Sequence, residues 1–278
     1  MKKIYDCFTF FNELDLLEIR FEELYNFVDY FVLVESDHTF MNNPKPYYFE
    51  ENKQRYARFL DKVIHIKSKS NCYENPWSNE AFQRNSILEG IVGAASNDLV
   101  IVSDVDELIR SSVIADILQT DSNLFLFEMP AFYYKFNFVE TSVLYPWSMA
   151  SNASTVKEIG PESFRFLRLR YFERDPLFFE EHPNYTLIRN AGWHFGYVGD
   201  NEFVKHKLNN FSHAPEQSDK YRDTFDMNLE LRSLGGTRVP VCLDEYFPKT
   251  IVNNIEKYQH YILSEADKKI TDYIKDAF

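Results

Sequence analysis

The sequence predicts an α/β protein with a mostly parallel central sheet and flanking helices. In the first half of the chain, short apolar runs rich in β-branched residues alternate with stretches whose apolar residues recur at helical spacing. Strands that are buried on both faces and separated by helices are typical of parallel sheets with right-handed crossovers. The 278 residues, of which 45% are hydrophobic and 17% aromatic, suffice for a large globular core.

Each element of the first half follows from a local pattern. The predicted strands cover residues 3–10, 30–36 and 63–67 and a run that starts at residue 99. A first helix begins after Asn12, a residue type that caps helices, and a second covers about residues 79–95. The second helix leads directly into the fourth strand.

The second half is more mixed. Residues 123–136 predict one or two long aromatic strands, a helix follows residue 200, and a helical tail starts at about residue 244. No Gly/Ser-rich linker marks a boundary, so we expect one domain. We expect its nucleotide-binding half at about 1–110, its acceptor and catalytic half at about 111–243, and the tail at about 244–278.

Composition excludes several classes of partner and site. The net charge of −13 argues against nucleic acid as a partner. No apolar run approaches the roughly 18 residues that span a bilayer, and no signal-peptide core follows the first residues, so we expect a cytoplasmic protein without an integral membrane segment. Cys7, Cys72 and Cys242 are widely spaced and predict free thiols rather than disulfides or a zinc site.

The stretch LVIVSDVDELI, which begins at Leu99, carries the clearest functional signal. A run suited to burial leads directly to Asp104, Asp106 and Glu107. Ligands of open α/β sheets bind beyond the carboxyl ends of the strands, where these carboxylates fall. The alternative is that the acids belong to a solvated loop or to the first turn of the next helix.

The D-V-D spacing suggests a cation site. An extended D-V-D segment sends both Asp side chains to one side and Val105 back toward the protein. Two carboxylates at such a short separation repel each other unless a cation lies between them. Their hard oxygens suit Mg²⁺ or Mn²⁺, which neutralise substrate phosphates in such sites.

Longer segments resemble known sugar transferases. AFQRNSILEGIVGAASNDLVIVSDVDE resembles the segment of GT-A-type nucleotide-sugar transferases in which an Arg-Asn pair opens the helix before the D-x-D strand. DCFTFFNELDLLEIRFEEL, FVLVESDHTF and IVSDVDE, in this order, resemble glycosyltransferase family 17. AGWHFGYVGDNEFVKHKL and YFPKTIVNNIEKYQHYIL extend the resemblance over most of the chain.

The resemblance implies a GT-A-type fold, an inverting transfer from a UDP-sugar and a divalent metal. The donor is expected to be UDP-GlcNAc and the acceptor a glycan or glycolipid. Two departures stand out. Ile109 and Arg110 replace a Pro that is common in the family, and Met41, Asn42 and Asn43 replace a Gly that often follows T-F.

Roles on the donor side can be assigned residue by residue. Asp106 is the first candidate for a direct metal ligand, Asp104 for the metal or the ribose, and Glu107 for orienting either. Arg84 is a candidate for the donor's phosphate or base, with a surface ion pair as the alternative. Glu35, at the end of the second strand, is expected to accept hydrogen bonds from uridine or else to cap a helix.

Roles on the acceptor side centre on the segment GWHFGYVGDNEFVKHKL. An inverting transferase needs a base near the acceptor hydroxyl, and Glu202 is the first candidate, with Asp200 second. Both residues are also ordinary helix-capping carboxylates. His213 is a candidate metal ligand, and His194 a candidate for the metal shell or the donor phosphate; either can instead be structural. Aromatic faces for sugar rings are expected among Tyr133, Tyr134, Trp147, Trp193 and Tyr197.

These assignments together predict a metal-dependent inverting glycosyltransferase. One alternative is a sugar nucleotidyltransferase, which normally carries a Gly-rich phosphate loop that is absent near residues 4–12. Another is a non-catalytic sugar-binding module, which would need neither the metal pair nor a base.

Overall fold

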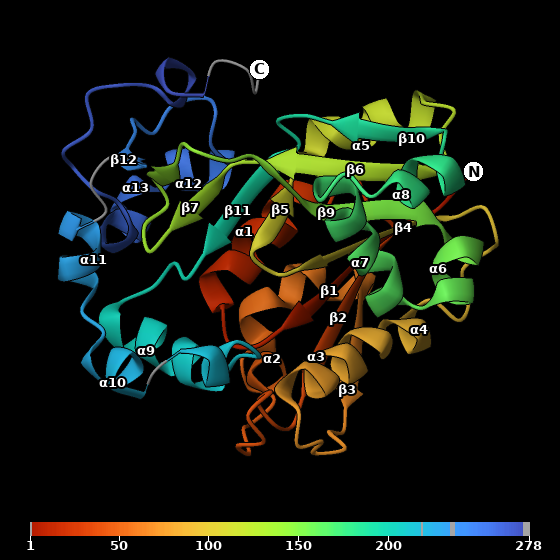
Figure 1. Ribbon diagram of the computed structural model, residues 1–278, viewed down its shortest axis with the longest axis horizontal. Coiled ribbons are helices and arrows are strands. Elements are labelled where there is room, and N and C mark those ends of the chain that lie inside the picture. Colours follow the sequence, from red (N-terminus) through yellow and green to blue (C-terminus); the bar gives the residue numbers. More distant parts are fainter. Residues whose placement is uncertain (1, 218, 234–236, 275–278) are drawn as a thin grey trace.

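The computed structural model describes residues 2–217, 219–233 and 237–274. A seven-stranded sheet forms its centre, in the order β10-β6-β9-β4-β1-β2-β3 (Figure 1). β1, β2, β3 and β4 pair in parallel, as do β6 and β10, whereas β9 is antiparallel to both of its neighbours. The strand bounds are β1 Ile4–Phe10, β2 Tyr30–Ser36, β3 Val63–Ser68, β4 Leu99–Asp104, β6 Leu124–Met129, β9 Tyr145–Asn152 and β10 Tyr185–Ile188.

Helices cover both faces of this sheet. Alternate residues of β1, such as Phe8 and Cys7, enter two different core clusters. One cluster packs against α1, and the other against α4, α6, α7 and α8. The bounds of these helices are α1 Leu14–Leu24, α4 Ile87–Gly90, α6 Ala153–Ile159, α7 Pro161–Phe172 and α8 Pro176–Glu181. The result is a three-layer α/β/α arrangement, which confirms the predicted fold class.

A second sheet, in the order β12-β8-β7-β11-β5, lies beside the first. β5 follows β4 after a two-residue turn, so this sheet begins where the D-V-D segment leaves the central one. β11 is antiparallel to β5 and parallel to β7. The bounds are β5 Glu107–Ile109, β7 Ala131–Tyr133, β8 Phe138–Glu140, β11 Gly192–Gly196 and β12 Arg238–Pro240.

The remaining helices are short and complete the walls around the junction of the two sheets. Side-chain caps mark where two of the longer helices begin. Asn75 accepts the Trp77 N–H at the start of α3, and Asp200 accepts the Phe203 N–H at the start of α9. The bounds are α2 Tyr48–Glu51, α3 Pro76–Asn85, α5 Ser111–Gln119, α9 Asn201–Asn210, α10 Asp219–Thr224, α11 Met227–Ser233, α12 Lys249–Val252 and α13 Ile255–Tyr258, with 3₁₀ turns at Lys53–Lys62, Ala214–Glu216, Gln259–Tyr261 and Ile270–Asp272.

The C-terminal segment packs against α1 and the second sheet. In Figure 1 it lies in blue beside β7 and β12, far from β3. Ile251 and Tyr258 share a buried cluster with Leu16 and Ile19 of α1. None of the described helices has the length and apolar composition that crossing a bilayer requires.

Three local predictions were wrong. The N-cap of α1 is Glu13, whereas the Asn12 side-chain oxygen is buried and lacks a partner among the described residues. The helix expected over 79–95 is two helices that end at Gly90. Consequently the Arg84-Asn85 pair closes α3 and does not open the helix that precedes β4.

Candidate functional site

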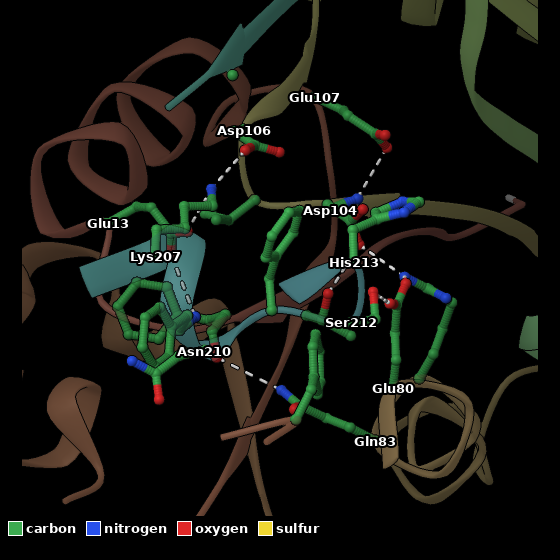
Figure 2. A pocket seen from close by; sticks show the side chains of 18 of the residues that line it. Glu13, Glu80, Gln83, Asp104, Asp106, Glu107, Lys207, Asn210, Ser212 and His213 are labelled. Carbon is green, nitrogen blue, oxygen red and sulfur yellow. Dashed lines mark hydrogen bonds and ion pairs between the residues drawn. The ribbon is translucent and has the colours of Figure 1, made fainter. Parts of the chain in front are cut away.

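A pocket of about 550 Å³ lies at the junction of the two sheets. It opens beyond the carboxyl ends of β1, β2 and β4, where open α/β sheets bind ligands. Its walls come from α3, α7, β7, β11 and α9. Its volume lies within the roughly 300–1,000 Å³ that is typical of ligand sites. Figure 2 shows Asp104, Asp106 and Glu107 on one side of this pocket, with Lys207 reaching Asp106.

A buried arginine fixes the backbone of the D-V-D turn. Arg20 of α1 forms a bidentate pair with Asp6 of β1, with its Nη2 2.5 Å from Asp6 Oδ1. Its Nη1 donates to the main-chain oxygens of Asp104 at 2.9 Å and Glu107 at 3.1 Å. Arg20 and Asp6 are completely buried, so their pairing sets where the turn sits relative to the sheet.

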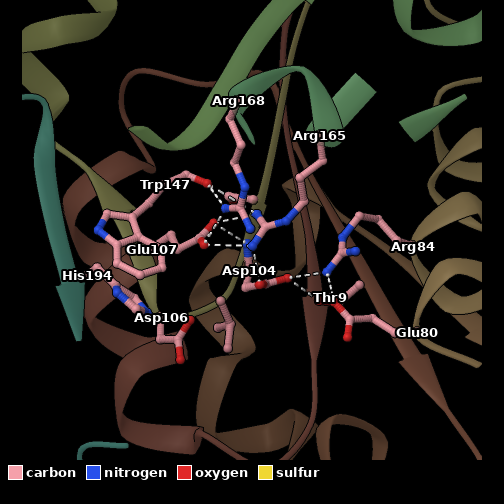
Figure 3. Close-up of polar contacts among 12 residues, drawn as sticks. Thr9, Glu80, Arg84, Asp104, Asp106, Glu107, Trp147, Arg165, Arg168 and His194 are labelled. Carbon is pink, nitrogen blue, oxygen red and sulfur yellow. Dashed lines mark hydrogen bonds and ion pairs between the residues drawn. The ribbon is translucent and has the colours of Figure 1, made fainter. Parts of the chain in front are cut away.

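Three arginines, Arg84, Arg165 and Arg168, contact the carboxylates of Asp104 and Glu107 (Figure 3). Asp104 Oδ2 lies 2.5 Å from Arg165, and its Oδ1 accepts from Arg84 at 3.0 Å and from Thr9 at 2.8 Å. Glu107 accepts two hydrogen bonds from Arg165, each 2.7 Å long, and its Oε2 also accepts the Asp104 N–H. The charge at the end of β4 is therefore neutralised mainly by side chains of α3 and α7.

The pairing shifts the acidity of these groups. Burial by itself raises the pKa of Asp104, but the guanidinium groups of Arg165 and Arg84 outweigh burial and hold that pKa well below its usual range. The pKa of Glu107 is lowered in the same way, mainly by Arg165. Arg168 contacts Glu107 at 3.3 Å, and burial beside Arg165 lowers its pKa. Both carboxylates are therefore ionised throughout the neutral range.

Asp106 has a different environment. Its Oδ2 accepts from Lys207 of α9 at 2.9 Å, and the same ammonium lies 2.8 Å from Glu13 Oε1. The Glu13 carboxylate also accepts the N–H groups of Phe11 and Asn12. Burial opposes the charge on Lys207, but Asp106 and Glu13 raise its pKa well above the ordinary value. Lys207 is thus a permanent cation shared by two carboxylates.

His194 of β11 faces the other oxygen of Asp106. Its Nε2 lies 3.9 Å from Asp106 Oδ1, and its ring packs on Trp147 with centroids 3.8 Å apart. Nδ1 is buried and has no hydrogen-bond partner among the described residues. Burial lowers the pKa of His194, so the imidazole is neutral at pH 7 and can offer a lone pair.

The arrangement fits a divalent ion at Asp106 but not at both Asp residues. Two atoms that each ligate one Mg²⁺ or Mn²⁺ at about 2.1 Å lie at most about 4.2 Å apart, and Asp106 Oδ1 and His194 Nε2 meet that limit. Asp104 is committed to arginines instead. Within the part of the chain that the structure describes, no three acidic, His or Cys side chains converge on one metal position.

The structure places the other donor-side candidates as follows. Arg84 lines the pocket but is not a surface residue: it is 2% exposed and bonds Glu80, Asp104 and Glu162. Glu35 is completely buried, does not line the pocket, and accepts the Phe49 N–H at 3.1 Å in the first turn of α2. Its geometry corresponds to the capping alternative.

The acceptor-side candidates lie farther out. The Glu202 side chain is 85% exposed and faces Lys205, and Asp200 caps α9; neither residue lines the pocket. His213 lines the pocket edge, where its Nδ1 lies 2.7 Å from Glu216 and its ring packs edge-on against Trp77. The structure thus brings His194 to Asp106 and leaves both predicted bases outside.

The aromatic candidates divide in the same manner. Tyr133, Trp147 and Tyr197 line the pocket, whereas Trp193 is buried in a core cluster and Tyr134 packs behind the wall. All three cysteines are free, as expected.

Sequence reasoning missed three pocket residues that neutralise its carboxylates, namely Arg165, Arg168 and Lys207. It also missed Glu13, a buried carboxylate that shares Lys207 with Asp106. Lys207 lies within a quoted motif, at the third position of KHK, but nothing in the sequence links it to Asp106, 101 residues away. The R-F-L-R spacing of Arg165 and Arg168 puts both on one helical face, a signal that could have suggested an anion or carboxylate partner.

A family model and the curated relatives both relate the chain to glycosyltransferases. Residues 1–228 match the family model described as glycosyltransferase family 17. The chain is 24% identical to β-1,4-mannosyl-glycoprotein 4-β-N-acetylglucosaminyltransferase of Homo sapiens and of Rattus norvegicus. The alignments cover 94% of this chain and 55% and 54% of those proteins, so the chain spans about half the length of the curated relatives it matches.

Similar solved structures are more distant. One is 4-diphosphocytidyl-2C-methyl-D-erythritol synthase, with a TM-score of 0.40 and 10% identity over 57% of this chain and 78% of that one. Another is the apo form of the glycosyltransferase GlyE of Streptococcus pneumoniae, with a TM-score of 0.34 and 10% identity over 68% of this chain and 46% of that one. Neither is close enough to support a conclusion.

Proposed function

Because the chain belongs to glycosyltransferase family 17, we propose that it transfers a sugar from a UDP-sugar to a glycan or glycolipid acceptor, with inversion at the anomeric carbon. The named relatives are N-acetylglucosaminyltransferases, which makes UDP-GlcNAc the donor we propose. The observation that carries the proposal is the pocket beyond β1, β2 and β4, with Asp106 and the neutral His194 facing each other inside it.

The charge of the pocket favours a divalent cation as part of the donor complex. Among the described residues, six carboxylates and five Lys or Arg side chains line it. A nucleoside diphosphate brings further negative charge into this balance, and Mn²⁺ or Mg²⁺ offsets it. We propose that Asp106 and His194 hold this ion, with the diphosphate supplying further ligands. The ion, when bound, stabilises the negative charge on the departing UDP.

The protein's own residues bind and orient the donor. Asp104 accepts three hydrogen bonds, which leaves a carboxylate with room for one more, and its side chain is 29% exposed toward the pocket. We propose that a ribose hydroxyl of the UDP-sugar donates the fourth hydrogen bond to Asp104. Tyr133 and Tyr197 offer ring faces to the transferred sugar.

Incubation of the protein with UDP-GlcNAc and Mn²⁺, without acceptor, tests this proposal. Slow release of UDP and free GlcNAc is expected, and Asp106→Asn should abolish it. A nucleotidyltransferase would instead exchange labelled pyrophosphate into UTP, a result that would overturn the proposal. UDP-GlcNAc binding without hydrolysis, and without transfer to any acceptor in a glycan array, would identify a non-catalytic sugar-binding module.

A further inference from the structure

Lys207 contacts Asp106 through Oδ2, whereas Oδ1 of the same carboxylate faces His194. Its ammonium is 2.9 Å from Asp106 Oδ2 and 2.8 Å from Glu13 Oε1, and the three side chains are at most 16% exposed (Figure 2). Lys207 is on α9, whereas Asp106 and Glu13 follow strands of the central sheet. The ammonium is therefore a resident counterion of the Asp106 carboxylate.

This position sets up a conflict with the metal. A divalent ion on Asp106 Oδ1 places two cations around one small carboxylate in a partly buried site, where like charges repel strongly. The repulsion is relieved when a diphosphate enters, because its oxygens can accept from the ammonium and ligate the ion together. The lysine side chain is long and flexible enough to exchange a carboxylate partner for a phosphate partner.

We propose that Lys207 couples the binding of the divalent cation to the binding of the nucleotide diphosphate. Without nucleotide, Lys207 neutralises Asp106 and keeps the affinity for Mn²⁺ low. With nucleotide, Lys207 contacts the diphosphate and Asp106 ligates the ion. This inference rests on the proposed function, since it requires a diphosphate donor and a metal at Asp106.

The coupling is reciprocal, so it can be measured without catalysis. Mn²⁺ affinity is determined from the electron paramagnetic resonance signal of free Mn²⁺, with and without UDP. Lys207→Met should bind Mn²⁺ alone about tenfold or more tightly than the parent, because the competing charge is gone. UDP should then increase Mn²⁺ affinity much less in this variant than in the parent protein.

Lys205→Met is the matched control, since Lys205 is on the same helix and faces the exposed Glu202. It should behave as the parent in every titration. Loss of Lys207 leaves Glu13 buried without its cation, so the double variant Glu13→Gln/Lys207→Met is measured beside it, with thermal unfolding as a check on folding. Both variants should bind Mn²⁺ alone more tightly than the parent.

Equal Mn²⁺ affinity of the parent and both Lys207 variants, each with UDP-dependent binding intact, would overturn the coupling role and leave the proposed function standing. Absence of Mn²⁺ binding in the parent protein even with saturating UDP would instead overturn the metal assignment, and the coupling role with it.

Discussion

At the scale of single residues, the end of β4 is organised by buried charge pairs. Arg165 bonds both Asp104 and Glu107, and Arg84 bonds Asp104 from the other side. Breaking a buried pair from one side costs more than the pair itself contributes, because the remaining charge stays in a poorly solvated place. These arginines are therefore positioning residues for the carboxylates of the pocket.

Replacement of Arg165 by Met should lower the free energy of unfolding by about 3–5 kcal/mol, since it leaves Asp104 and Glu107 short of their main cation. Arg170→Met is the control, because Arg170 pairs with partly exposed carboxylates of Asp175 and Glu181, and its loss should change stability far less. Urea unfolding measures both. Equal midpoints for the two variants would contradict the assigned role of Arg165.

The same pairs predict how stability depends on pH. The pKa values of Asp104 and Glu107 are lower in the folded than in the unfolded protein, so the unfolded state takes up protons first as pH falls. Their stabilising contribution is complete near neutral pH and decreases below about pH 4. Unfolding temperatures measured from pH 7 to pH 3 should show this decrease, and it should be smaller in Arg165→Met. A parallel decrease in both proteins would argue against the pairing.

The position of Glu202 predicts that it is not the base in this conformation. Its side chain is 85% exposed and outside the pocket, so Glu202→Gln should retain turnover close to that of the parent. Loss of general-base catalysis typically costs about 10²- to 10⁴-fold in rate. Measurement of UDP-GlcNAc turnover distinguishes the two cases: a decrease of that size in Glu202→Gln would show that α9 turns its first residues toward the acceptor.

At the scale of elements, the pairing of β11 with β5 positions His194 and Glu107 in the site. This antiparallel pairing sets His194 opposite Glu107 and places Gly192 against Ile109. A Cβ atom at Gly192 would lie 1.8 Å from the main-chain oxygen of Leu108, so only glycine allows the strands to approach this closely.

Gly192→Ala should therefore destabilise the protein by about 1–3 kcal/mol and weaken Mn²⁺-dependent UDP binding, because β5 and β11 must separate. Gly93→Ala is the matched control, since nothing lies within 4 Å of a Cβ there. Thermal unfolding and calorimetry measure the two effects. If Gly192→Ala matches Gly93→Ala in both, the strand pairing does not position His194.

The elements best predicted from sequence were the strands of the parallel core, whose apolar runs needed no tertiary information. The second strand, Tyr30–Ser36, has the predicted bounds. The helix expected over 79–95 is interrupted at Ser86, which ends α3 and precedes the first residue of α4, a break that apolar periodicity does not signal. Asn12 failed as a cap because Glu13 folds back onto the N–H groups of Phe11 and Asn12.

At the scale of the whole molecule, the site lies where two sheets and several distant segments meet. The sequence predicted the position of the D-V-D segment at a strand end, because that depends on neighbouring residues alone. It did not predict the cations, since Arg165 and Lys207 approach from 58 and 101 residues away along the chain. Nor did it predict that Asp104 and Asp106 take different partners, because that follows from the turn fixed by Arg20.

Residues of the C-terminal segment pack on α1. The family model ends at residue 228, yet Ile251 and Tyr258 are buried against Leu16 and Ile19. Because α1 also carries Arg20, which holds the D-V-D turn, the segment beyond the family match supports the site through this helix.

Calorimetric titration of UDP into the protein, with Mn²⁺ and then with a chelator, tests the central claim most directly. If Asp106 and the pocket form a metal-assisted nucleotide-sugar site, UDP should bind at least about tenfold more tightly with Mn²⁺, and Asp106→Asn should remove most of that difference. Identical UDP affinity in Mn²⁺ and in chelator, in a protein that remains folded, would contradict the claim.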